Sequence, residues 1–97
     1  MSVIVHVRHF LNRKGERAFP QLFEEHRRRA AAFPGFVSLR HSPPVVGDST
    51  SEIEMTLEFA DESLLQNWRS SPDHAQVAAA YQPSWIREPE VTFSRRD

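Results

Sequence analysis

Hydrophobic and polar residues alternate along four segments of the chain. In the first, Val3, Val5 and Val7 fall on one side of an extended chain, and Ile4 and His6 fall on the other. Residues 52–59 alternate most clearly, because apolar side chains take every second place between glutamates and a threonine. Alternation with a period of two is typical of a strand with one buried face. The predicted strands are residues 3–10, 36–42, 52–59 and 91–95.

After the first strand, the apolar residues recur at steps of three and four, the spacing of a helix with one buried face. This helix is expected from about Glu16 to Ala32, after a turn at Asn12–Gly15. Pro20 is unfavourable deep inside a helix, so the first turn is expected near Arg17–Phe19. The buried stripe consists of Phe19, Leu22, Phe23, His26, Ala30 and Phe33.

Two shorter helices are predicted from their capping residues. Asp61 is a favourable N-cap for a helix that buries Trp68. Ser71 is a favourable N-cap for the next helix, with Pro72 at its first position. That helix is expected to end before a second proline, and its inner side chains are His74, Val77, Ala78 and Tyr81.

The resulting order, β-α-β-β-α(α)-β, is that of the ferredoxin-like split βαβ arrangement. We therefore predict an α+β fold with a four-stranded antiparallel sheet and the helices on one of its faces. The length of 97 residues suits one domain, and residues 1–97 are interpreted as such.

The face of the sheet that the helices leave uncovered allows two interpretations. We expect it to carry Phe36, with Val37 and Leu39 pointing inward. Its other residues are Ile4, His6, Arg8, Arg40, Glu54, Glu58 and Thr92. Antiparallel sheets tolerate a solvated face. Alternatively, the face packs on a two-fold copy and forms a homodimer, with arginines of one chain opposite glutamates of the other.

Charge and composition restrict the possible partners. Twelve basic and thirteen acidic residues give a formal charge of −1, which does not favour nucleic acid or an anionic membrane as a partner. The absence of cysteine excludes disulfides, thiolate catalysis and cysteine metal sites. The first residues predict a strand and not a signal peptide, and no stretch approaches the length of a spanning helix, so a cytoplasmic location is expected.

Residues 59–74, FADESLLQNWRSSPDH, carry a recognisable pattern. They resemble the F-x-[DS]-x-x-x-L-x-x-W-x-x-S-P-x-H motif of the antibiotic biosynthesis monooxygenase (ABM) domain family, and residues 33–36 are similar to the family's turn before its second strand. The resemblance spans about residues 3–93. It implies a dimeric α+β barrel made by two packed sheets. Members include cofactor-independent oxygenases of phenols and quinols, haem-degrading enzymes, and proteins without an assigned activity.

The chain departs from the haem-degrading members of that family. Ala78 stands where they have the histidine that ligates haem, and Arg8 stands where they have an asparagine of the first strand. Both differences argue against haem degradation.

The family motif singles out Trp68 and His74 as candidate catalytic residues. Trp68 is expected either to fill the core or to form an aromatic wall whose N–H binds a quinone or phenol oxygen. His74 is expected either to tie the helix start to the core or to accept a phenolic proton, since imidazole titrates near neutral pH. The expected substrate-binding residues are His26, Tyr81, His9 and Phe23.

A zinc site made by His9, His26, His41 and His74 is a lesser alternative, because these residues lack the close spacing of metal motifs. No metal or other cofactor is expected, and no glycine-rich phosphate loop is present.

Three functions remain open. The first is a cofactor-independent monooxygenase acting on a small aromatic phenol or quinol. The second is a non-catalytic, ligand-binding or stress-related dimer of the same fold. The third is another small barrel enzyme, such as an isomerase or lyase. The first two need the same apolar pocket, so the sequence does not separate them.

Overall fold

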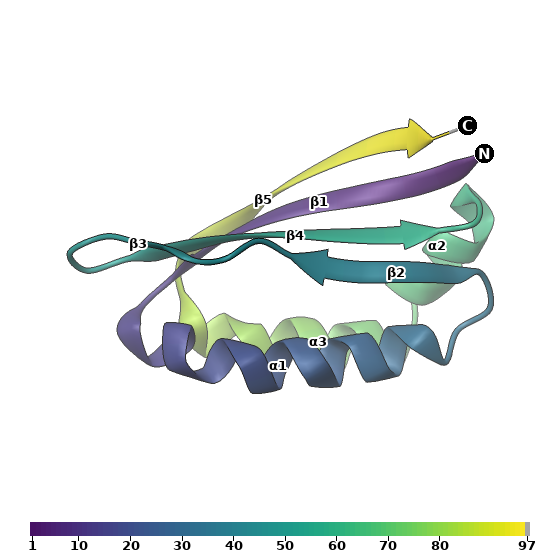
Figure 1. Cartoon of the computed structure of the whole chain (residues 1–97). Coiled ribbons are helices and arrows are strands. Elements are labelled where there is room, and N and C mark those ends of the chain that lie inside the picture. The colour runs from purple at the N-terminus through teal and green to yellow at the C-terminus, as the bar shows by residue number, and fades with distance from the viewer. Residues whose placement is uncertain (97) are drawn as a thin grey trace.

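The helices of this chain cover one face of a sheet and leave the other face open (Figure 1). The computed structural model describes residues 1–96. The helices are α1 (Arg13–Ala31), α2 (Glu62–Arg69) and α3 (Pro72–Tyr81), followed by the 3₁₀ turn η1 (Gln82–Ser84). The strands are β1 (Ser2–Leu11), β2 (Phe36–His41), β3 (Val45–Val46), β4 (Ser51–Phe59) and β5 (Trp85–Arg96). The predicted α+β fold with helices on one face is confirmed.

All strand pairs are antiparallel, in the order β2-β4-β1-β5. The sheet has five strands and not the predicted four, because Val45–Val46 forms the additional strand β3 against the start of β4. The second strand is predicted to end at residue 42, and the chain does leave the β2 ladder before Pro43 and Pro44. It then pairs again for two residues, which a proline does not prevent at a sheet edge.

The second strand contains a bulge that reverses part of the predicted pattern. Phe36 lies opposite Phe59, and Ser38 lies opposite Glu58, so Val37 is the extra residue. Phe36 therefore shares the helix-covered side with Phe59, whereas Val37 is exposed. The expectation that Phe36 lies on the open face and Val37 points inward is wrong, since a bulge shifts the alternation by one residue. Leu39 is buried as expected.

The first helix begins three residues earlier than predicted. Asn12 is its N-cap, and the Asn12 side chain accepts a hydrogen bond from the Gly15 N–H at 2.6 Å. Asn12 also donates through its backbone N–H to the Ser84 carbonyl and through its side chain to the Pro83 carbonyl. The expected turn at residues 12–15 is thus the cap and first turn. Pro20 lies inside the helix, where it removes one backbone donor.

The caps of the two later helices are confirmed. The Asp61 carboxylate accepts from the Leu64 N–H at 2.9 Å, and the Ser71 hydroxyl accepts from the His74 N–H at 3.1 Å. The last strand begins at Trp85, six residues before the predicted start. This extension brings Trp85 beside the end of β1.

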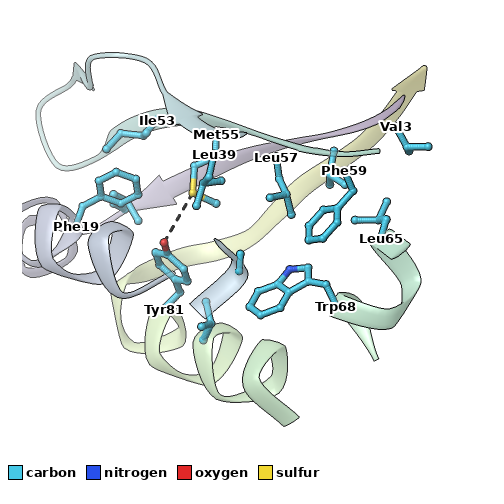
Figure 2. Packing of buried hydrophobic residues seen from close by; sticks show 14 residues of the cluster. Val3, Phe19, Leu39, Ile53, Met55, Leu57, Phe59, Leu65, Trp68 and Tyr81 are labelled. Atoms are coloured by element: carbon cyan, nitrogen blue, oxygen red, sulfur yellow. Dashed lines mark hydrogen bonds between the residues drawn. The ribbon is translucent and has the colours of Figure 1, made fainter. Parts of the chain in front are cut away.

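The core lies between the sheet and the helices and is formed by the inward residues of β1 and β4 with Trp68 and Tyr81 (Figure 2). Figure 2 shows Trp68 beneath the sheet, with its nitrogen facing the strands, and the Tyr81 hydroxyl directed at Met55. Within residues 1–96, no helix is both long enough and apolar enough to cross a membrane.

Candidate functional site

A cavity of about 200 Å³ lies between the sheet and the helices. Its lining comes from β1, β4 and β5 on the sheet side and from α1, α2 and α3 on the helix side. Most of the lining is aliphatic or aromatic. Its polar groups are three histidines, a tyrosine, the two tryptophans and Arg69, with no carboxylate among the lining residues of the described chain.

Five of the six residues singled out in the sequence line this cavity: His9, His26, Trp68, His74 and Tyr81. They come from β1 and from all three helices, so only the folded chain brings them together.

Phe23, the sixth, is not among the lining residues of the cavity. Its ring packs against Phe19 at 5.7 Å and against His41 at 4.5 Å between ring centroids. Although Phe23 and His26 share the inner stripe of α1, the two side chains meet different neighbours. The structure thus gives Phe23 a packing position outside the cavity.

His9 is 2% exposed and lies flat against the Tyr81 ring, with 4.9 Å between ring centroids. The Trp85 indole N–H donates to its Nδ1 at 3.2 Å. Burial lowers the pKa of the His9 imidazole from 6.5 to about 4, so the ring is neutral near neutral pH. Because Nδ1 accepts, the proton of the neutral ring is on Nε2. No described residue accepts a hydrogen bond from that nitrogen.

His26 and Tyr81 form a buried pair, with 3.1 Å between His26 Nδ1 and the Tyr81 hydroxyl oxygen. The same hydroxyl lies 3.7 Å from the Met55 sulfur, and the tautomer of His26 decides which member of the His26–Tyr81 pair donates. Burial, followed by the charges of His74 and His9, lowers the pKa of His26 to about 3. Burial also raises the pKa of the Tyr81 hydroxyl above its ordinary value. Near neutral pH the His26 imidazole and the Tyr81 hydroxyl are therefore uncharged, and each can donate and accept a hydrogen bond.

Trp68 is fully buried at the centre of this aromatic group. The His26 ring is nearly parallel to its ring, with 5.9 Å between centroids, and His74 meets it edge-on at 5.5 Å. The indole nitrogen has no hydrogen-bond partner among residues 1–96. This packing is that of a core residue, and the binding of a quinone or phenol oxygen by the indole N–H stays a prediction.

His74 differs from the other histidines of the cavity because it is half-buried. Its backbone N–H binds the cap Ser71, and no ring hydrogen bond to a described residue is present. Burial, and then the nearby Arg69 guanidinium, lower the pKa of the His74 imidazole below 6.5. It is therefore an unprotonated base near neutral pH that solvent reaches.

Two polar lining residues, Arg69 and Trp85, were not among the residues predicted from the sequence. Arg69 lies beside the motif tryptophan, and its guanidinium also covers the Phe93 ring, with 5.0 Å between its carbon and the ring centroid. Arg69 directly follows Trp68 in the sequence, and this position next to a candidate site residue could have identified it. Trp85 contacts His9 because the pairing of β1 with β5 is irregular at Arg8–Leu11. No pattern in the sequence predicts this irregularity.

No group of three or more potential metal ligands occurs within the described residues. His41 lies outside the cavity, where its ring contacts Phe19 and Phe23. The four histidines of the zinc alternative therefore do not converge.

Comparison with known proteins finds likeness in structure. No family model matches the sequence, and no curated protein matches it. Rv0793 from Mycobacterium tuberculosis has 18% identity and a TM-score of 0.79 over 99% of this chain and 95% of that one. A Nitrosomonas europaea protein assigned as an antibiotic biosynthesis monooxygenase has 7% identity and a TM-score of 0.81, covering 98% and 89%.

SnoaB from Streptomyces nogalater, named a cofactor-independent oxygenase, has 16% identity and a TM-score of 0.63, covering 100% of this chain and 95% of its own. The chain has the fold of these proteins. The α+β fold of the single chain, implied by the resemblance of residues 59–74, is thereby confirmed, while the dimeric barrel stays a prediction. Identities below 20% leave the activity to be argued from the site.

Proposed function

We propose that this chain is an ABM-type monooxygenase that oxidises a small aromatic phenol or quinol with O₂, without a metal or flavin, and that it acts as a homodimer. The observation that carries this proposal is the cavity in which a half-buried, neutral His74 meets the buried Trp68 edge-on.

The lining suits a flat, uncharged substrate. Trp68, Tyr81 and the histidines present aromatic faces and only a few hydrogen-bonding groups. A closed apolar cavity of about 150 Å³ accommodates benzene, so a volume of about 200 Å³ favours ligands of one or two rings. An anionic substrate would have Arg69 as its only permanently charged partner in the lining.

His74 supplies the base that such a reaction needs. It takes the phenolic proton and leaves an electron-rich phenolate, which reduces O₂ directly. Arg69 lies close enough to lower the pKa of His74 and is positioned to stabilise the negative charge that develops. A naphthol, C₁₀H₈O, and O₂ then give the naphthoquinone C₁₀H₆O₂ and water. One oxygen atom enters the ring, the other leaves as water, and the substrate supplies all the electrons.

Substitution of the base tests this role. His74→Ala should lower kcat for a naphthol by about 10²–10⁴, the usual contribution of a positioned general base. The rate should also fall as acid protonates His74, whose pKa burial and Arg69 hold below the ordinary value. His41→Ala is the matched control, because His41 is exposed and lies outside the cavity. An unchanged rate in His74→Ala would remove His74 from the mechanism.

The homodimer is supported by the uncovered face of the sheet (Figure 1). Arg8 on that face lies 3.7 Å from Glu54 and 4.0 Å from Glu90, all three being about half exposed. Such ion pairs can exchange partners across a two-fold axis, as the sequence analysis expected.

A further inference from the structure

The first turn of α3 carries His74 but has little apolar anchorage of its own. The buried side chains of α3 are Val77 and Tyr81, which lie in the second half of the helix. The first turn is held by its Ser71 cap and by the edge-on contact of the His74 ring with Trp68. Because burial of apolar side chains is the main force that fixes a helix on its neighbours, polar contacts gain weight at this end of α3.

Arg29 of α1, the helix that lies beside α3 (Figure 1), supplies such contacts. Its Nη1 donates to Asp73 Oδ1 at 3.2 Å and to Gln76 Oε1 at 2.5 Å, on either side of His74 in the sequence. Its Nε donates to Glu25 of its own helix at 2.8 Å, which directs the guanidinium toward α3. Within residues 1–96, the pair of Arg29 with Asp73 is the one ion pair that joins two helices.

The contribution of Arg29 is expected in geometry more than in stability. Partly exposed ion pairs add little to the free energy of unfolding. A planar guanidinium bound to three acceptors, however, fixes the relative position of the groups that it joins. The neighbouring Arg28 bonds to the same Glu25 but to no residue of α3 within the described chain. The two arginines therefore provide a matched comparison.

We propose that Arg29 is a positioning residue, which ties the first turn of α3 to α1 and so holds His74 edge-on to Trp68 at the cavity. The inference rests on the proposed function for the catalytic role of His74. The place of the His74 ring is measured by NMR without turnover, so the two ideas can fail separately.

The first test follows the His74 ring in Arg29→Ala and in Asp73→Ala. Loss of the contact should move the ring away from Trp68 and further into water. Its proton signals should then lose the shift that the indole ring current causes, and its pKa should rise toward 6.5 in both variants. The other charges that face His74 are Arg69 of α2 and, when protonated, His26 of α1, and both variants retain them.

An effect of charge alone gives a different result. Removal of a cation raises the pKa of a histidine, whereas removal of an anion lowers it. A His74 pKa that rises in Arg29→Ala but falls in Asp73→Ala would therefore overturn the proposal. Proton signals of the His74 ring that stay at their wild-type positions in both variants would overturn it as well.

The control and the conservative variant complete the test. Arg28→Ala should leave the ring signals and the pKa of His74 at their wild-type values. Arg29→Lys keeps the charge but not the forked, planar donor, so it should restore only part of the wild-type signal positions. With a naphthol as substrate, Arg29→Ala should lower kcat about tenfold, because small displacements of a reacting group are costly, while KM stays within about twofold.

The two proposals give separate outcomes. A His74 ring that moves as described in a protein that oxidises no naphthol would support the positioning role of Arg29 and remove the oxygenase activity. Naphthol oxidation that is as fast in Arg29→Ala as in the wild type would leave the oxygenase and remove the positioning role.

Discussion

The buried histidines of the cavity should make the protein sensitive to mild acid. His9 and His26 are 2% and 7% exposed, and burial holds their pKa values at about 4 and about 3, below the ordinary 6.5. In the unfolded chain both rings recover the ordinary value. Between pH 6.5 and pH 4 the unfolded state therefore binds protons that the folded state does not. Stability is full above pH 6.5 and is lost as the pH falls.

The expected loss can be worked out for one pH interval. At pH 5.5 an unfolded histidine is about nine-tenths protonated, while the folded His9 and His26 remain neutral. Each residue then lowers the free energy of unfolding by about 1.4 kcal/mol relative to pH 8, and the pair by about 3 kcal/mol. A domain of this size has about 5–15 kcal/mol in total.

Urea unfolding at pH 8 and at pH 5.5 measures this difference. The midpoint should fall by about 1–3 M, given the usual slopes for small proteins. His9→Phe and His26→Phe should each remove about half of the pH-dependent loss, and His41→Phe should retain all of it. A midpoint that is equal at both pH values, or an undiminished loss in both cavity variants, would refute the assignment of buried neutral histidines.

Two further substitutions test the fold and the assembly. Gly15→Ala should cost about 1–2 kcal/mol in thermal or urea unfolding, because a Cβ there would lie 2.4 Å from the Ser84 Cβ and overpacking outweighs the helix propensity gained. Lys14→Ala in the same turn should change stability by under about 0.5 kcal/mol, and equal effects of the two would contradict the close contact. Glu54→Arg should raise the dimer dissociation constant at least about tenfold by light scattering if the open face is the contact, whereas Glu24→Arg on α1 should not. If light scattering finds the wild-type protein monomeric at micromolar concentrations, the proposed homodimer is refuted.

Much of the fold could be predicted from local signals. Alternation located β1 and β4, and the caps Asp61 and Ser71 located α2 and α3, because these features depend on neighbouring residues. The start of α1 could not be predicted in the same way. Its first turn contains Gly15, a residue typical of turns, whose close approach to Ser84 is a contact between distant parts of the chain.

The site, like the fold, could be predicted where local patterns determine it and not where contacts between distant residues do. The inner helical stripes brought His26, His74 and Tyr81 to one cavity, as expected from their spacing. The same stripe also included Phe23, because helical periodicity separates inside from outside but does not distinguish neighbours within the core. The contact between His9 and Trp85 depends on the irregular register of β1 and β5, which only tertiary pairing fixes.

The central claim is that this chain inserts oxygen from O₂ into a small phenol with its own residues. Its most direct test supplies ¹⁸O₂ and a naphthol to the purified protein in the presence of a metal chelator and without flavin. The account predicts a naphthoquinone with one ¹⁸O atom per molecule, formed with one O₂ consumed, and a rate that collapses in His74→Ala. Absence of label from the product, or of O₂ uptake across one- and two-ring phenols and quinols, would contradict it and leave a ligand-binding protein.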